Sequence, residues 1–260
     1  MLSEPDYPPC APYGVLDACA VNHDISTPVA NLPAEVRERV FVIIPAYNEA
    51  DRIAEVAAEV GAQYPNVIVV DDGSTDKTYE AARKGPARVL RHVLNRGQGA
   101  AIQTGIDFAL AQGAEYIVTF DADGQHRVED ICALLRPIVD GECDITLGSR
   151  FLTGNVNMPA TRRMLLRWGV LFTRIVSRVK LTDTHNGLRG FSRQAAEKID
   201  ITLDRMAHAS ELIDQIRASG LPFREVPVEV RYTAYSLAKG QSAKGALRIL
   251  VHYLSGRILP

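Results

Sequence analysis

Three apolar segments of the chain each end in a polar loop, and this repeated arrangement constrains the fold more than any other feature. The segments are Phe41–Ile44, Val67–Val70 and Tyr116–Phe120, and the loops that follow them begin at Pro45, Asp71 and Asp121. A helix-like stretch follows each loop, and such alternation predicts βαβ units in a parallel sheet. Because the carboxyl ends of parallel strands share one edge, we expect the three loops to form one site.

The third loop contains two carboxylates separated by a single residue, Asp121-Ala122-Asp123. A buried strand cannot carry them inside the sheet, but its carboxyl end can direct them into a ligand crevice. Two acids with this spacing can hold a hard divalent cation, which takes its other ligands from water and substrate phosphates. The alternative for the triplet alone is a polar turn, since Asp and Gly are common turn formers.

Length and composition predict one large domain. The chain has 260 residues, and 47% of them are hydrophobic, which is enough for a single α/β core. A formal net charge of -2 argues against electrostatic binding of nucleic acid. The four cysteines show no metal-site spacing, the amino terminus lacks the features of a secretory signal, and no apolar run has the length of a membrane span. We therefore expect a cytoplasmic protein.

Charge is distributed unevenly along the chain. From Asn157 to Arg193 there are eight Lys or Arg residues and one acid, and no Asp or Glu follows Glu229. Within this region Thr161–Lys180 has the pattern of a basic amphipathic helix, which can lie in a membrane interface or pack on the core as an ordinary surface helix. The asymmetry indicates an anionic ligand or contact with a membrane surface.

Five short motifs follow one another in a fixed order. They are IPAYNE at Ile44–Glu49, VDDGSTD at Val70–Asp76, NRGQGA at Asn95–Ala100, DADGQH at Asp121–His126 and GSRF at Gly148–Phe151. Together they resemble the family 2 glycosyltransferases, in particular the dolichol- and polyprenol-phosphate mannose synthase-like branch, over roughly Val40 to Ser242. The resemblance implies a GT-A-like α/β fold, with a Rossmann-like, mixed but mostly parallel sheet flanked by helices. It also implies that the protein transfers a sugar from a UDP- or GDP-linked donor, with inversion at the anomeric carbon.

The resemblance also implies how the chain is divided. Residues 1–38 are expected to be a Pro-rich amino-terminal extension, and residues 39–242 the GT-A glycosyltransferase domain. Within that domain, residues 39–151 form the nucleotide-binding half and residues 152–242 the acceptor half. Residues 243–260 are expected to form an amphipathic basic segment.

By the same resemblance, the acidic loops bind the donor and its cation. Asp123 is expected to bind Mg²⁺ or Mn²⁺, with Asp121 and Gln125 as further ligands, so that the charge on the departing diphosphate is stabilised. The residues expected at the donor nucleotide are Pro45, Ala46, Tyr47, Glu49, Asp71, Asp72, Arg96, Gly97, Gly99, Asp121 and Ala122. We expect His126, the last residue of the DADGQH motif, to be non-catalytic.

The acceptor is expected to contact basic side chains at the end of the nucleotide-binding half and beyond it. The candidate acceptor- or phosphate-binding residues are Arg150, Arg189, Arg231 and Lys239, and the candidate catalytic residues are Asp123, Asp183, His208 and Glu211. Which of the last three acts as a base stays open. Many family 2 enzymes with hydroxyl acceptors carry a Glu-Asp pair where this chain has Glu211-Leu212. A hydroxyl needs a base to remove its proton, whereas a phosphate monoester is already ionised, so the missing pair favours a phosphate acceptor.

These observations predict a metal-dependent glycosyltransferase whose favoured acceptor is a polyprenyl phosphate at the inner face of the membrane, which the protein contacts peripherally. The alternative is a soluble transferase that modifies a sugar or natural-product hydroxyl. A sugar nucleotidyltransferase, or a non-catalytic subunit that binds nucleotide sugars, is less favoured.

Overall fold

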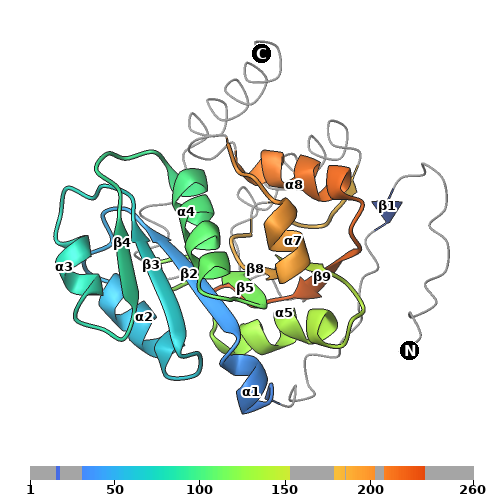
Figure 1. Ribbon diagram of the computed structural model, residues 1–260, viewed down its shortest axis with the longest axis horizontal. Coiled ribbons are helices and arrows are strands. Elements are labelled where there is room, and N and C mark those ends of the chain that lie inside the picture. Colours follow the sequence, from blue (N-terminus) through green and yellow to red (C-terminus); the bar gives the residue numbers. More distant parts are fainter. Residues whose placement is uncertain (1–15, 18–30, 153–178, 185, 203–207, 232–260) are drawn as a thin grey trace, which may run out of the picture.

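The computed structural model describes residues 16–17, 31–152, 179–184, 186–202 and 208–231. Within these ranges a seven-stranded sheet, in the order β4-β3-β2-β5-β8-β6-β9, forms the centre of the molecule (Figure 1). Its strands are β2 (Val40–Ala46), β3 (Asn66–Asp71), β4 (Arg88–Arg91), β5 (Tyr116–Thr119), β6 (Ile145–Ser149), β8 (Arg189–Ser192) and β9 (Phe223–Pro227). A separate parallel pair joins β1 (Leu16–Asp17) to β7 (Val179–Lys180).

The strands run mostly in one direction. β2 pairs in parallel with β3 and β5, β3 pairs in parallel with β4, and β6 pairs in parallel with β9. β8 is antiparallel to both of its neighbours, β5 and β6. The carboxyl ends of β2, β3, β5 and β6 therefore lie at the same edge, and β8 begins at that edge. The predicted mixed, mostly parallel sheet is confirmed, and so is the shared edge of the three loops.

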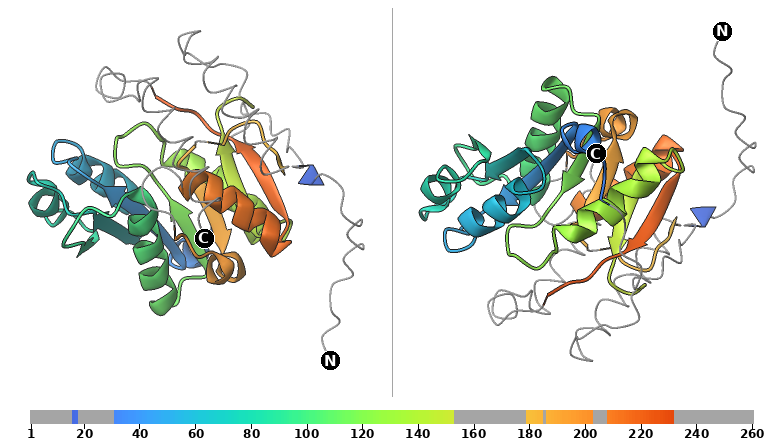
Figure 2. Two further views of the ribbon diagram at one scale, coloured as in Figure 1. Left: turned by 90° about the horizontal axis from the view of Figure 1, so that it is seen from above. Right: turned by 90° about the horizontal axis from the view of Figure 1, so that it is seen from below.

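Helices cover both faces of the sheet (Figure 2). Contacts place α2, α3 and α5 on one face and α4, α7 and α8 on the other. The helices are α1 (Ala34–Arg37), α2 (Ile53–Gly61), α3 (Thr78–Ala82), α4 (Gln98–Ala111), α5 (Glu129–Val139), α7 (Arg193–Lys198) and α8 (His208–Ser219). Along β2, Val42 and Ile44 pack into one core while Phe41 and Ile43 pack into the other. A strand that is buried on both faces needs the unbroken apolar run seen in the sequence.

Most predicted elements lie within a few residues of the observed ones, and two differ. The helix-like stretch expected directly after the first polar loop begins only at Ile53, because the loop before it is hydrogen-bonded in a non-helical form. Asn48 in that loop has φ 54°, its amide donates to Ser74 Oγ, and its side chain accepts from the amide of Thr75. The amphipathic helix expected over Thr161–Lys180 falls largely outside the described residues, but its last two positions form β7.

The described residues also bear on the ends of the domain. Leu32, which precedes the expected start of the domain, is only 2% exposed and packs in the core with Val40. Among the described segments, no helix has both the length and the apolar character needed to cross a bilayer. The expected carboxy-terminal segment, residues 243–260, lies outside the described residues.

Candidate active site

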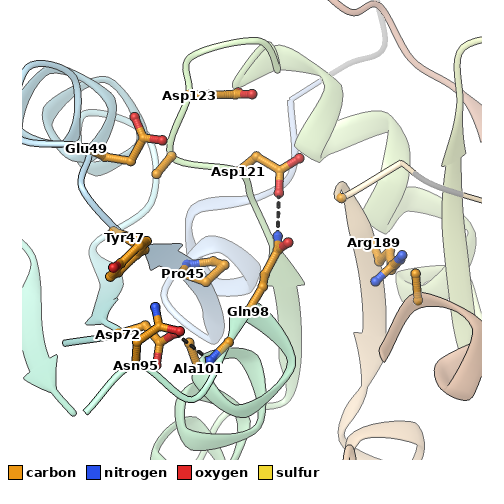
Figure 3. Close-up of a pocket in the computed structure, with 15 residues that line it drawn as sticks. Pro45, Tyr47, Glu49, Asp72, Asn95, Gln98, Ala101, Asp121, Asp123 and Arg189 are labelled. Carbon is orange, nitrogen blue, oxygen red and sulfur yellow. Dashed lines mark hydrogen bonds between the residues drawn. The ribbon is translucent and has the colours of Figure 1, made fainter. Parts of the chain in front are cut away.

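A pocket of about 510 Å³ opens at the carboxyl edge of the sheet (Figure 3). Ten of the residues expected at the site line it: Pro45, Ala46, Tyr47, Glu49, Asp72, Gly97, Asp121, Ala122, Asp123 and Arg189. They come from the end of β2 and the loop after it, the loops after β3 and β5, the residue before α4, and the start of β8. This volume lies within the range of pockets that bind small molecules and cofactors. The three polar loops therefore do meet in one cavity.

Asp121 is fixed by side chains from two other parts of the site. Its Oδ1 accepts a hydrogen bond of 3.1 Å from Gln98 Nε2, at the first residue of α4 (Figure 3). Its Oδ2 lies 3.0 Å from Nε2 of His126, which is 4% exposed. The carboxylate also lies against Gly187, where an added Cβ would come within 2.2 Å of both carboxylate oxygens. Both oxygens of Asp121 are thus directed by the protein, and a side chain at position 187 would displace this carboxylate.

Asp123 has a different environment. Burial and the negative charge of Asp121 raise the pKa of Asp123 to about 6. Its Oδ1 accepts a hydrogen bond of 3.0 Å from the backbone amide of Gln125. Gln125 therefore contacts Asp123 through its main chain. A neighbouring cation would offset both the burial and the repulsion between the two acids.

The described residues contain no cluster of three or more His, Cys, Asp or Glu side chains that could hold a metal ion alone. Two hard carboxylates that line one pocket still fit Mg²⁺ or Mn²⁺, because Mg²⁺ in particular usually keeps waters and takes substrate phosphates as ligands.

Arg189 is the cation of the pocket. It is 5% exposed, and within the described part of the chain its guanidinium makes no hydrogen bond or salt bridge. Burial lowers the pKa of Arg189, whereas Asp121 and Asp183 raise it. Because it pairs across the sheet with Thr119 of β5 and Leu147 of β6, it lies between the two halves of the edge. A buried guanidinium with unused donors is suited to an anionic ligand.

Asp72 holds the glycine loop that precedes α4. One of its oxygens accepts hydrogen bonds from the amide of Arg96 at 2.9 Å and from His92 Nδ1 at 2.7 Å, and the other accepts from the amide of Gly97 at 2.6 Å. His92 Nε2 in turn lies 2.9 Å from Thr104 Oγ1 in α4. Asp72 therefore shapes the wall of the pocket by fixing this loop.

Three other expected donor residues stand outside the pocket lining. Asp71 is buried, accepts from the amide of Ser74, and forms a salt bridge of 3.1 Å with Arg91. Arg96 is exposed and contributes its backbone amide to Asp72. Gly99 is buried in the first turn of α4.

The expected acceptor-side residues Arg150 and Asp183 pair with each other. Arg150 Nε lies 2.6 Å from Asp183 Oδ2, and both residues are buried. Glu225 of β9 holds the chain segment that contains Asp183. Its carboxylate accepts hydrogen bonds from the amide and the hydroxyl of Thr182, at 2.8 Å each, and from the amide of Asp183 at 3.1 Å. Burial raises the pKa of Glu225, while these hydrogen bonds lower it. The network fixes the backbone beside Arg150.

The remaining candidates are spread around the site. Glu211 in the first turn of α8 accepts from the amide and hydroxyl of Thr202 and does not line the pocket. Arg231 is exposed, lies 4.0 Å from Glu59, and donates its amide to the carbonyl of Gln125. The side chain of His208 and all of Lys239 lie outside the described residues; Ala209, next to His208, does line the pocket.

Sequence reasoning did not assign roles to several residues of the site. Gln98 and Asn95 line the pocket and lie within the NRGQGA motif, so the motif itself was a signal for them. His92 and Glu225 make their contacts with acids or loops that the sequence places on other elements, whereas His126 contacts Asp121 within its own loop. Glu225 meets Thr182 and Asp183 only because the strands of the sheet pair as they do.

The fold and the acidic pocket define a GT-A glycosyltransferase. The fold is similar to that of glucosyl-3-phosphoglycerate synthase from Mycobacterium tuberculosis, crystallised with Mn²⁺, uridine diphosphate and glucosyl-3-phosphoglycerate. The likeness has a TM-score of 0.63 at 19% sequence identity and covers 85% of this chain and 80% of that one. At this identity the comparison shows the fold alone.

Residues 41–200 match the family model described as glycosyl transferase family 2, and the chain belongs to this family. It is 34% identical over 231 residues to polyprenol monophosphomannose synthase of Mycolicibacterium smegmatis, which covers 83% of this chain and 86% of that protein. It is 32% identical over 237 residues to a UDP-N-acetylglucosamine–dolichyl-phosphate N-acetylglucosaminyltransferase of Methanococcus voltae, with 83% and 94% covered. The resemblance seen in the motifs is confirmed, and the protein is a glycosyltransferase.

Proposed function

We propose that this protein transfers a sugar from a nucleotide-diphosphate sugar to a polyprenyl phosphate, with inversion at the anomeric carbon. The observation that carries the proposal is the composition of one pocket: two acids suited to a cation and a buried arginine suited to an anion line the same cavity. The two relatives named above carry polyprenol and dolichyl phosphate in their names, which supports this acceptor class.

The donor is proposed to lie along the loops after β2 and β3, with its diphosphate at the acidic triplet. Pro45, Tyr47 and the glycine loop held by Asp72 form the wall for the nucleoside. Asp123, assisted by Asp121 and Gln125, would hold Mg²⁺ or Mn²⁺, which supplies Lewis-acid stabilisation of the leaving diphosphate when bound. Arg189 faces the same region and donates N–H groups to phosphate oxygens, for which a planar guanidinium is well shaped.

The transfer itself is a displacement at the anomeric carbon. An oxygen of the acceptor phosphate forms the new bond as the bond from that carbon to the nucleoside diphosphate breaks, so the product is a glycosyl phosphate lipid and the released group is a nucleoside diphosphate. Such an acceptor needs no base. In agreement, Glu211 is hydrogen-bonded to Thr202 and Asp183 is paired with Arg150, and neither lines the pocket.

Transfer of label provides the test. The protein is incubated with labelled UDP- and GDP-sugars, Mn²⁺ or Mg²⁺, and a polyprenyl phosphate, and we expect the label in an organic-extractable product. Asp123→Asn is the inactive control, and the anomeric configuration of the product reports inversion. Label only in water-soluble glycosides would support the alternative, a hydroxyl acceptor. Release of nucleoside triphosphate with sugar phosphate would instead indicate a nucleotidyltransferase.

A further inference from the structure

Among the described residues, the side chain of His126 makes a single hydrogen bond, and its partner is an acid of the pocket. Its Nε2 lies 3.0 Å from Asp121 Oδ2, its side chain is 3% exposed, and its ring packs edge-on against Phe120 with centroids 5.6 Å apart. An ionised carboxylate only accepts hydrogen bonds, so the proton of the ring must be on Nε2. The contact therefore has a defined direction, from the imidazole to Asp121.

The other ring nitrogen shows that packing alone does not explain this residue. Within the described residues, Nδ1 of His126 is buried and has no hydrogen-bond partner. A buried polar atom without a partner costs free energy that an apolar side chain of similar size would avoid. Unsatisfied groups of this kind in folded proteins often mark functional positions. The hydrogen bond to Asp121 is the contact that gives a histidine an advantage here.

Asp121 is held from three directions at once. His126 hydrogen-bonds to one oxygen and Gln98 to the other. The carboxylate also lies close to the Cα of Gly187, where a side chain would collide with it. These partners come from the loop after β5, the start of α4 and the segment before β8. The orientation of Asp121 is consequently fixed before any ligand binds, which is the condition for a preorganised electrostatic site.

We propose that His126 is a positioning residue that acts through Asp121, fixing this carboxylate for the diphosphate and cation of the donor. The inference rests on the proposed function, because it assigns the donor to this pocket. His126 itself touches no substrate. Its partners are Asp121 and Phe120, and its removal should leave the fold intact while Asp121 loses its orientation.

The first experiment measures binding, without acceptor and without turnover. Titration calorimetry measures the affinity of three proteins, the wild type, His126→Phe and His126→Gln. The ligand is UDP in the presence of Mn²⁺ and, in a separate titration, GDP in the presence of Mn²⁺. Phe keeps the ring packing on Phe120 but cannot donate, and Gln can place an amide N–H near the lost Nε2. We expect His126→Phe to weaken binding about 10- to 100-fold, as for other partners that orient metal-site ligands, and His126→Gln to recover part of that loss.

A double-mutant cycle with Asp121→Ala tests whether His126 acts through this acid. If it does, adding His126→Phe to Asp121→Ala costs nothing further in affinity. Gln98→Leu is expected to behave like His126→Phe, whereas Gln112→Leu, at the exposed end of the same helix, should bind as the wild type does. Wild-type affinity in His126→Phe, or additive effects in the cycle, would overturn the proposal. Because binding is read directly, a failure of sugar transfer would count against the proposed function and leave this result standing.

Discussion

Asp121 accepts hydrogen bonds from Gln98 and His126, whereas Asp123 accepts one from the amide of Gln125. Two identical side chains, two residues apart, therefore have different surroundings. Asp121 is oriented by neighbouring side chains, and Asp123 keeps the raised pKa that burial and a nearby negative charge produce. A single pocket can in this way contain one acid with fixed geometry and one acid whose charge is stabilised best by a cation.

We predict that the effect of Mn²⁺ on stability depends on pH through Asp123. Its folded pKa of about 6 exceeds the ordinary value of 3.8, so the ionised form is disfavoured in the folded protein. This group therefore lowers the stability of the ligand-free protein as pH rises from about 4 to about 6, and the loss persists above that range. Mn²⁺ binds the ionised form, so it should raise the melting temperature at pH 7.5 but not at pH 5.

The measurement is a thermal melt at both pH values, with and without Mn²⁺. Asp123→Asn removes the buried charge, so this variant should be more stable than the wild type at pH 7.5 in the absence of metal. It should also show no shift with Mn²⁺ at either pH. A Mn²⁺ shift that is equal at pH 5 and pH 7.5, or that survives in Asp123→Asn, would contradict the assignment of Asp123 as the metal ligand.

Among the secondary-structure elements, β8 separates what the sequence could predict from what it could not. The βαβ units were predictable because each strand, loop and helix is contiguous, and the acidic loops follow their strands directly. The antiparallel insertion of β8 between β5 and β6 depends on pairing between distant segments. For the same reason the contact of Gly187 with Asp121, and that of Glu225 with Thr182, left no local pattern. Arg189 was predicted only through the resemblance to the family.

We predict that Glu225→Gln destabilises the edge formed by β6 and β9. Both carboxylate oxygens of Glu225 accept from the amide of Thr182, and a Gln side chain would turn an N–H toward that donor. Leaving buried donors unpaired costs about 1–3 kcal/mol in the free energy of unfolding. Urea denaturation measures this loss, and hydrogen exchange at the amides of Thr182 and Asp183 locates it.

The matched control is Glu229→Gln, a few residues further along the chain. Glu229 is exposed and pairs with Arg127, so its loss should change stability by no more than about 1 kcal/mol. We also expect Glu225→Gln to raise the KM for the acceptor more than that for the donor, because the loop it holds lies beside Arg150. Equal stabilities of the two Gln variants would show that the Glu225 network does not support this edge.

On the scale of the whole molecule, the acidic and the basic residues of the site come from different parts of the sequence. The acidic loops come from the nucleotide-binding half, Arg150 comes from the end of that half, and Arg189 comes from the acceptor half. The net charge of -2 does not show this uneven distribution of charge along the sequence. After Glu229, for example, the chain contains no Asp or Glu. An enzyme that takes a water-soluble donor and a membrane-bound acceptor would benefit from such a division, because a basic surface is attracted to anionic lipid headgroups.

We predict that the protein binds anionic liposomes through basic residues of the segment Thr161–Lys180, which has the sequence pattern of a basic amphipathic helix. The double charge reversal Arg163→Glu with Arg167→Glu should weaken co-sedimentation with liposomes, more at low salt than at high salt, because exposed charges are screened by ions. The double reversal Lys84→Glu with Arg88→Glu, at two exposed positions of the first half of the chain, provides a charge-matched control. Unchanged sedimentation of the double variant at low salt would refute the membrane contact.

The antiparallel course of β8 has a practical meaning for engineering. Because β6 ends at the pocket edge and β8 starts there, the stretch of chain between them leaves and re-enters the sheet on the same side. Within this stretch β7 pairs with β1, and Thr182 and Asp183 are held by Glu225, so changes that keep these residues in place need not shift the register of the seven-stranded sheet. Grafting this stretch from one relative into another should exchange the preferred recipient of the sugar while the nucleotide preference stays with the host.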